Sequence, residues 1–266
     1  MSLPKWQLII VTFLLYQRSI RAQENPSKRI RYGFPADPKQ FPYQVFIIGL
    51  EDYHSKGSCG GDIITNRIVL TAAHCIPKNI HAVQIYFGTV DRSNELEVGQ
   101  QRLIVKAEHS FVHQEYDNSQ HLNDIALIRL PADLLFDEYI QPAKLPNADE
   151  LYENKSAVVS GWGLTSYNDP QPNHLQYYNV TVFSNEECKN LMIAVSKIFP
   201  TSFICLKPSQ STPCRGDSGG PLAIRNEDGS HTLLGLTSFG ITGCPIKSPV
   251  VYTRVSSFLQ WIKQYE

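Results

Sequence analysis

Short runs of apolar and β-branched residues, separated by turn residues, recur along the chain from about residue 40. The clearest runs are Tyr43–Ile48, Arg67–Leu70, Val83–Phe87, Leu103–Val105, Ala157–Ser160, Thr232–Leu236 and Val250–Thr253. This pattern is typical of an antiparallel β protein and not of alternating strand and helix units. We therefore predict an all-β fold.

The end of the chain breaks this pattern. Residues 255–266 carry apolar side chains at i, i+3, i+4 and i+7, namely Val255, Phe258, Leu259 and Ile262. These positions share one face of an amphipathic helix. We predict a short C-terminal helix over 255–266 that packs on the β structure.

Two internal segments also differ from the strand pattern. A second helix is expected within Cys188–Ile198, with Ser184 or Asn185 as its N-terminal cap. Residues 131–156 are rich in Pro, Asp and Glu and have few strand signals. We interpret them as the connection between two β halves.

The first 22 residues have the features of a secretory signal. Lys5 supplies a positive charge, and residues 8–16 form an apolar run that is too short to span a bilayer comfortably. Ala22 is the candidate cleavage residue, so we interpret residues 1–22 as a cleaved signal peptide and the protein as secreted and extracellular. The alternative interpretation is an N-terminal membrane anchor.

The charge balance gives no reason to expect a polyanionic partner. The formal net charge is -1, and no long block of like charges is present. Such a chain has no global field that favours nucleic acid or an anionic membrane surface. We expect a monomer that binds neither.

Secretion changes the interpretation of the six cysteines, because an even number in an exported chain favours disulfides over metal ligands or free thiols. They are Cys59, Cys75, Cys188, Cys205, Cys214 and Cys244. Spacing alone does not choose among the possible pairings. Asn154 and Asn179 each begin an Asn-X-Ser/Thr pattern and are candidate N-glycosylation sites.

Three short stretches carry residues suited to nucleophilic catalysis. They are Leu70–Cys75, Asn123–Leu127 and Gly216–Pro221, which contain His74, Asp124 and Ser218. A serine hydroxyl becomes a good nucleophile when a neighbouring imidazole takes its proton. A buried carboxylate on the other imidazole nitrogen holds the correct tautomer and stabilises the transient positive charge.

With these stretches the sequence resembles the chymotrypsin-like serine proteases from about Ile30 to the C-terminus. Further landmarks agree in order and spacing, namely Cys59–Gly61, Gly161–Gly163, Ser238–Gly240 and Val251–Val255. The resemblance implies two antiparallel six-stranded Greek-key β-barrels with the active site between them. The protease domain would span 30–266, with halves at about 30–145 and 146–254 before the helix.

The resemblance also assigns residues around the nucleophile. The backbone N–H groups of Gly216 and Ser218 would form the oxyanion hole, where one such donor is typically worth about 2.7–4 kcal/mol. Ser238 would hydrogen-bond Asp124 and begin the strand that holds the substrate backbone.

Residues 23–29 would form an activation propeptide. By resemblance, a trypsin-like protease cleaves after Arg29, and the new ammonium group of Ile30 pairs with Asp217 inside the protein. Ile30 and Gly33 match the usual mature N-terminus, whereas Arg31 and Tyr32 depart from it. The alternative is that Lys28 and Arg29 are only a solvated charge pair.

The specificity pocket implied by the resemblance departs from that of trypsin. Its floor would be Thr212 instead of an aspartate, so a preference for Arg or Lys is not expected. Gly240 and Val250 would form the walls, and a branched Val250 should shorten the pocket. Small or medium aliphatic residues are expected first and aromatic residues second. Arg215 at the mouth could favour acidic neighbours in the substrate or be merely solvated.

By resemblance, Cys59 pairs with Cys75, Cys188 with Cys205 and Cys214 with Cys244. Some family members bind calcium in a loop of the first barrel, and Asp91–Gln101 contains Glu95 and Glu97. We expect no metal and no cofactor.

The sequence therefore predicts a secreted serine endopeptidase that acts through an acyl-enzyme. Its expected partners are protein and peptide substrates, an activating trypsin-like protease and protein protease inhibitors. The alternative is a catalytically silent binding or regulatory protein on the same scaffold, against which the intact triad argues. The short propeptide favours digestion or degradation over a role in a cascade.

Overall fold

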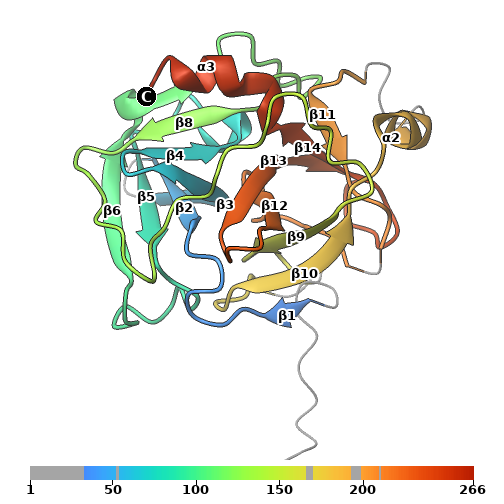
Figure 1. The fold of residues 1–266 in the computed structure, drawn as a ribbon. Helices are drawn as coiled ribbons and strands as arrows, with labels where there is room; N and C mark the ends of the chain where they lie inside the picture. Colours follow the sequence, from blue (N-terminus) through green and yellow to red (C-terminus); the bar gives the residue numbers. More distant parts are fainter. Residues whose placement is uncertain (1–32, 52–53, 166–169, 193–198, 210) are drawn as a thin grey trace, which may run out of the picture.

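The computed structural model describes residues 33–51, 54–165, 170–192, 199–209 and 211–266. Every strand that it contains belongs to one of two antiparallel sheets, which lie side by side (Figure 1). The predicted signal peptide and propeptide, with Arg29 and Ile30, lie outside the described residues.

The first half of the chain forms a sheet that closes on itself. Its order is β6-β5-β2-β3-β4-β8-β7. The bounds are β2 Gln44–Glu51, β3 His54–Thr65, β4 Ile68–Thr71, β5 Ala82–Phe87, β6 Gln101–Lys106, β7 Ser110–Val112 and β8 Ala126–Arg129. The edge strands β6 and β7 are separated in sequence only by the 3-10 helix η2 (Ala107–His109). β6, η2 and β7 therefore form one bent strand that pairs with β5 through its first part and with β8 through its second part. The barrel thus has six strands, one of which is divided into two segments.

The second half forms a sheet in the order β1-β10-β9-β12-β13-β14-β11. The bounds are β1 Phe34–Pro35, β9 Ser156–Gly161, β10 Gln176–Thr181, β11 Phe203–Cys205, β12 Pro221–Arg225, β13 His231–Gly240 and β14 Val250–Arg254. Strands β10 and β11 meet through a bridge between Val182 and Leu206. Six strands therefore close the barrel, and the two-residue β1 pairs outside β10. The predicted pair of β-barrels is confirmed.

Buried apolar side chains fill each barrel, and a further group of them joins the two halves. The first barrel is filled by residues such as Val45, Ile63, Val69, Ile85 and Phe87. The second is filled by residues such as Val159, Tyr178, Leu222, Leu234 and Tyr252. A third group draws on both halves and includes Phe46, Leu70, Ile125, Trp162 and Leu236. Because packed interiors resist displacement, this shared core fixes how the two barrels face each other.

The end of the chain crosses back to the first barrel (Figure 1). It forms the 3-10 helix η3 (Val255–Phe258) and then the α-helix α3 (Leu259–Lys263), instead of one α-helix over 255–266. The first turn is a tight 3-10 turn because Arg254, the residue before it, is still paired with Gly235 of β13. Trp261 donates through Nε1 to Gln114 Oε1 at 3.2 Å, which ties the helix to the first barrel.

The other predicted helix begins earlier than expected. Helix α2 spans Asn185–Met192. Ser184 caps it, because the N–H of Glu187 donates to Ser184 Oγ at 3.1 Å and the N–H of Ser184 donates to Glu187 Oε2 at 3.1 Å. Residues 193–198 lie outside the described part. Within that part, no helix has the length and apolar character needed to cross a membrane.

Candidate active site

His74 and Asp124 meet at the edge of the first barrel. His74 lies in the 3-10 helix η1 (Ala73–Cys75), directly after β4, and Asp124 lies just before β8. Strands β4 and β8 pair with each other, so their ends come together although 50 positions separate the two residues. Nδ1 of His74 lies 2.8 Å from Asp124 Oδ2, and the His74 N–H donates to Asp124 Oδ1 at 3.0 Å.

Asp124 is fully buried but well supplied with partners. Ser238 Oγ donates to Asp124 Oδ2 at 2.5 Å, and Thr253 Oγ1 donates to the Asp124 carbonyl at 2.8 Å. Burial alone would raise the pKa of Asp124, but the hydrogen bonds and charge of His74, with the bond from Ser238, lower it below its usual value. The carboxylate therefore stays ionised and holds the imidazole by Nδ1, which leaves Nε2 to accept a proton.

The loop that carries Ser218 lies directly against the segment that carries His74. The N–H of Gly60 donates to the Ser218 carbonyl at 2.8 Å. A Cβ on Gly219 would come within 2.2 Å of Thr71 Oγ1, and φ at Gly219 is +73°. Only glycine fits at this contact. The structure thus brings the loop of the predicted nucleophile to the end of β4, beside η1.

Some backbone N–H groups of this loop are paired within the described part of the protein and others are not. Asp217, Gly219 and Gly220 donate their N–H groups to carbonyls within the protein. Among the described residues, the N–H groups of Gly216 and Ser218 have no acceptor. Buried backbone N–H groups are usually hydrogen-bonded. The N–H groups of Gly216 and Ser218 are therefore available to an acceptor on a bound molecule. The positive φ of Gly216, +98°, produces the turn that makes them available.

Asp217 is buried behind the same loop. Its Oδ1 accepts the N–H of Gly163 at 2.7 Å, and its Oδ2 accepts the N–H of Cys214 at 2.9 Å. A Cβ at Gly161 or Gly163 would overlap the carboxylate, which explains the Gly-Trp-Gly motif. Burial raises the pKa of Asp217 to about 6, although the two hydrogen bonds oppose this shift. Among the described residues, no cationic side chain pairs with it.

A sequence model of the trypsin family matches residues 30–262 of this chain. The chain belongs to the trypsin family. It is 34% identical to chymotrypsin of Phaedon cochleariae over 94% of this chain and 87% of that protein. It is also 34% identical to serine protease filzig of Drosophila melanogaster over 84% of this chain, but it spans only 14% of that much longer protein.

A solved structure agrees with this assignment. The structure described as HL collagenase superposes with a TM-score of 0.75 at 34% identity, covering 88% of this chain and 96% of that one. The prediction of a chymotrypsin-like serine protease is confirmed. The protein is a serine endopeptidase, and its family acts on protein substrates.

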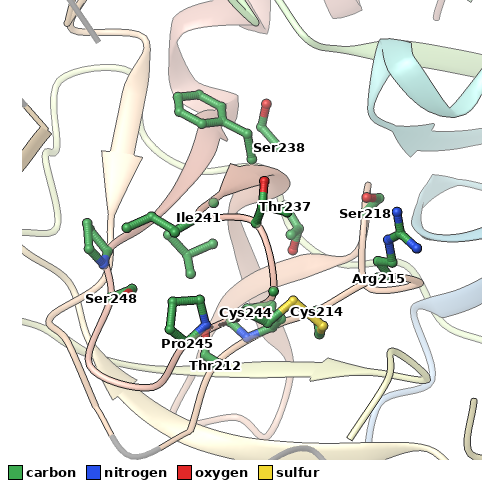
Figure 2. A pocket seen from close by; sticks show the side chains of 17 residues that line it. Thr212, Cys214, Arg215, Ser218, Thr237, Ser238, Ile241, Cys244, Pro245 and Ser248 are labelled. Carbon is green, nitrogen blue, oxygen red and sulfur yellow. Dashed lines mark hydrogen bonds between the residues drawn. A yellow bond between two sulfur atoms is a disulfide. The ribbon is translucent and has the colours of Figure 1, made fainter. Parts of the chain in front are cut away.

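A pocket opens beside Ser218 in this trypsin-family chain, and all four residues predicted to bind substrate line it: Thr212, Ser238, Gly240 and Val250. Figure 2 shows Ser218 and Arg215 at one side of the pocket, away from Thr212 and Ser248. Arg215 is the only charged residue among the described residues that line it.

Val250 lines this pocket and pairs with Gly240 of the neighbouring strand. A Cβ built on Gly240 would lie 3.6 Å from Cγ2 of Val250, which is ordinary van der Waals contact. Val250 is 7% exposed and Thr212 is 5% exposed, so both form a packed wall and floor. The disulfide between Cys214 and Cys244 joins the two chain segments that make these walls.

The other predicted sites lie apart from this pocket. The structure contains the disulfides Cys59–Cys75 and Cys188–Cys205, so all six cysteines are joined in the pairs that the resemblance implied. Asn154 and Asn179 are both exposed. Lys207 Nζ donates to Asn154 Oδ1 at 2.9 Å.

Two residues next to the site escaped the sequence interpretation. His121 stacks on Phe239 of the pocket with ring centroids 4.8 Å apart. Gln171 contacts the loop of Gly216. Neither belongs to a recognisable motif, and only a three-dimensional arrangement reveals them.

In the candidate calcium loop, Asp91–Gln101, the side-chain amide of Gln100 lies at the centre. Nε2 of Gln100 lies 2.9 Å from Thr89 Oγ1, 2.9 Å from the Asn94 carbonyl and 3.3 Å from Glu97 Oε2. It also lies 3.5 Å from the Asp91 carbonyl. Calcium in proteins takes six to eight oxygen ligands, several of them carboxylate. These oxygens already surround an amide donor and include one carboxylate, so the residues do not fit a calcium site.

We therefore expect calcium and chelators to leave the Tm of this protein unchanged. The Gln100→Glu variant should melt lower in chelator, because a new carboxylate would face Glu97, and should recover with millimolar calcium. Gln101→Glu, which adds the same charge at an exposed neighbour, is the control. A chelator-dependent Tm in the wild type would contradict this prediction.

Proposed function

We propose that this protein is a secreted serine endopeptidase that hydrolyses peptide bonds through an acyl-enzyme, with His74, Asp124 and Ser218 as its catalytic triad. The observation that carries the proposal is the buried, ionised Asp124 holding Nδ1 of His74 at 2.8 Å beside the loop of Ser218. His74 takes the proton of Ser218 as the hydroxyl attacks the peptide carbonyl. It then delivers that proton to the leaving amine, and water repeats the sequence on the acyl-enzyme.

The unpaired N–H groups of Gly216 and Ser218 are proposed to bind the oxyanion of each tetrahedral intermediate. Donors fixed before the reaction need no reorganisation when charge develops, so they stabilise the transition state more than the substrate. Their lack of an acceptor among the described residues supports this role.

Treatment of the activated protein with a serine-directed phosphonate tests the proposal. We expect one covalent adduct per molecule, on the peptide that contains Ser218, together with loss of peptidase activity. A processed protein that neither reacts nor cleaves any peptide would refute it and favour a silent binding scaffold.

Activation is proposed to follow removal of residues 1–22 as a signal peptide and 23–29 as a propeptide, with the last cleavage after Arg29. The support is Asp217, a buried carboxylate without a cationic partner among the described residues. Such a group is costly unless a charge pairs with it. The ammonium group of Ile30 would supply that charge and order the loop of Gly216.

The pocket favours a small or medium aliphatic residue before the scissile bond, with aromatic residues second and Arg or Lys disfavoured. Thr212 offers no charge to a cation, and Arg215 would repel one. The branched Val250 lines the pocket beside Gly240 of the neighbouring strand and is proposed to shorten it. Profiling on a peptide library varied at this position measures the preference directly.

Val250→Gly should shift the preference towards aromatic residues. Removing the branched side chain opens space, and a misfit of this kind is worth about 1–3 kcal/mol, or roughly 10–200-fold. We expect the ratio of kcat/KM for Phe over Val substrates to rise by at least about tenfold. Val98→Gly, made at an exposed residue of the first barrel, is the control. An unchanged ratio would contradict the proposed pocket.

Secretion is supported by the three disulfides, which persist in oxidising compartments. N-glycans on the exposed Asn154 and Asn179 fit that route. The proposed partners are protein substrates, a trypsin-like activating protease and protein protease inhibitors.

A further inference from the structure

Gln171 is hydrogen-bonded to the first barrel through both its side chain and its backbone carbonyl. Ser58 Oγ donates to Gln171 Oε1 at 2.9 Å. The guanidinium of Arg92 donates to the carbonyls of Gln171 at 3.1 Å and Pro172 at 3.0 Å. Arg92 itself lies over the ring of Phe46, 5.0 Å from its centroid, within the shared core. Gln171 belongs to the second half of the chain, so these bonds span the two barrels.

The amide nitrogen of this side chain contacts the loop that contains Gly216 and Ser218. A Cβ built on Gly216 would lie 2.5 Å from Nε2 of Gln171 and 3.2 Å from its Cδ. The amide therefore fills the space beside Gly216 that any larger residue would need. Ser58 stands two residues before Gly60, whose N–H holds the Ser218 carbonyl. The same strand thus supports both sides of the loop.

The Nε2 donor of Gln171 is enclosed and has no acceptor among the described residues. An enclosed donor without an acceptor is destabilising, and native proteins contain few of them. Of the enclosed side-chain donors that lack an acceptor among the described residues, that of Gln171 contacts Gly216, whose own N–H is also unpaired there. Both donors therefore add positive potential to one region, where no group of the described residues accepts them.

We propose that Gln171 is a positioning residue for the oxyanion hole. It holds Gly216 through the bond to Ser58, and it places the positive end of an amide dipole beside the developing negative charge. The proposal rests on the proposed function, because it needs Gly216 to bind the oxyanion. A residue that only filled space would be replaced without loss by an apolar side chain of the same length.

Gln171→Met and Gln171→Glu separate these roles. Met keeps the volume and removes both polar contacts. Glu keeps the shape and replaces the donor by a carboxylate, whose pKa burial beside Gly216 should raise. Gln260→Glu, at an exposed residue of α3, is the matched charge control. Each activated variant is assayed for kcat and KM on a peptide substrate between pH 6 and 9.

We expect Gln171→Met to lower kcat about tenfold with little change in KM, which is less than the loss of a direct oxyanion donor. Gln171→Glu should lower kcat about 100-fold at pH 9. Its deficit relative to wild type should narrow as the pH falls and the new carboxyl gains a proton. Ser58→Ala should lower kcat as much as Gln171→Met does. The double variant that combines these two changes should have a kcat no lower than either single variant.

Values of kcat within about twofold of wild type in both Gln171 variants would overturn the inference. A deficit in Gln171→Glu that equals that of Gln171→Met at every pH would also overturn it. If Gln171→Glu does not fold, Gln171→Met and Ser58→Ala still decide. A wild type that does not react with phosphonate refutes the proposed function, whereas a reactive wild type with unaffected variants refutes only this inference.

Discussion

Ser218→Ala should lower kcat of the activated enzyme by about 10⁶-fold, the loss expected when a triad loses its nucleophile. In the proposed mechanism this hydroxyl forms the acyl-enzyme, so no other side chain can complete the reaction by the same route. His74→Ala should cost about as much, and the double variant no more, because the residues act as a unit. The assay is hydrolysis of a peptide substrate that has an aliphatic residue before the cut.

The controls for this experiment separate chemistry from folding. Ser257→Ala makes the same change at an exposed serine of η3 and should leave kcat and Tm unchanged. Ser218→Ala should keep the wild-type Tm, because Ser218 is only partly buried and its backbone makes the contact with Gly60. Activity of Ser218→Ala within about tenfold of wild type would remove the basis for the proposed triad.

The sequence predicted those parts of the fold that depend on local pattern. Alternating strands, the cap at Ser184 and the apolar face of the C-terminal helix each follow from neighbouring residues. The helix nevertheless begins as the 3-10 helix η3, because Arg254 is still paired with Gly235 of β13. This strand pairing constrains the first turn in spite of the α-helical spacing of its apolar residues. The corner at η2, which makes six barrel strands into seven segments, has no local signal that we recognised.

The candidate site was predicted unevenly for the same reason. His74, Asp124 and Ser218 lie in distinctive stretches, so their order and spacing identified them before any geometry was known. Gln171 and Gly216 are 45 positions apart, and Gln171 is held by Ser58 of the other barrel, so the arrangement depends on the whole fold. His121 likewise gained its place against Phe239 only through the fold.

Three hydrogen bonds around the candidate site share a physical feature, which is that each joins the two halves of the chain. Gly60 in β3 holds Ser218, Ser58 in the same strand holds Gln171, and Ser238 in β13 holds Asp124. Hydrogen bonds across a packed interface are rigid, because neither barrel can shift without losing apolar contact. The division into two barrels therefore serves the precise geometry that the proposed reaction needs.

Asp217→Asn should have opposite effects before and after activation. In a precursor made uncleavable by Arg29→Gln, Asp217 has a raised pKa of about 6, whereas the unfolded value is near 3.9. The unfolded chain therefore loses this proton first, and stability falls as the pH rises from about 4 to 6. Removing the carboxylate should abolish this loss, so the variant should be relatively more stable at pH 8 by up to about 3 kcal/mol. Denaturant unfolding at pH 4 and pH 8 measures the difference.

In the activated enzyme the same change should be harmful. In the proposed activated state the carboxylate pairs with the ammonium of Ile30, and breaking a buried pair typically costs about 3–5 kcal/mol, which would lower kcat/KM by about 10²–10⁴-fold. Pairing raises the pKa of the α-amino group, so its contribution is full at neutral pH and is lost as the pH rises through the raised value. Asp149→Asn, at an exposed carboxylate, is the control. An activated Asp217→Asn enzyme with wild-type kcat/KM at pH 7 would show that this buried charge has no part in activation.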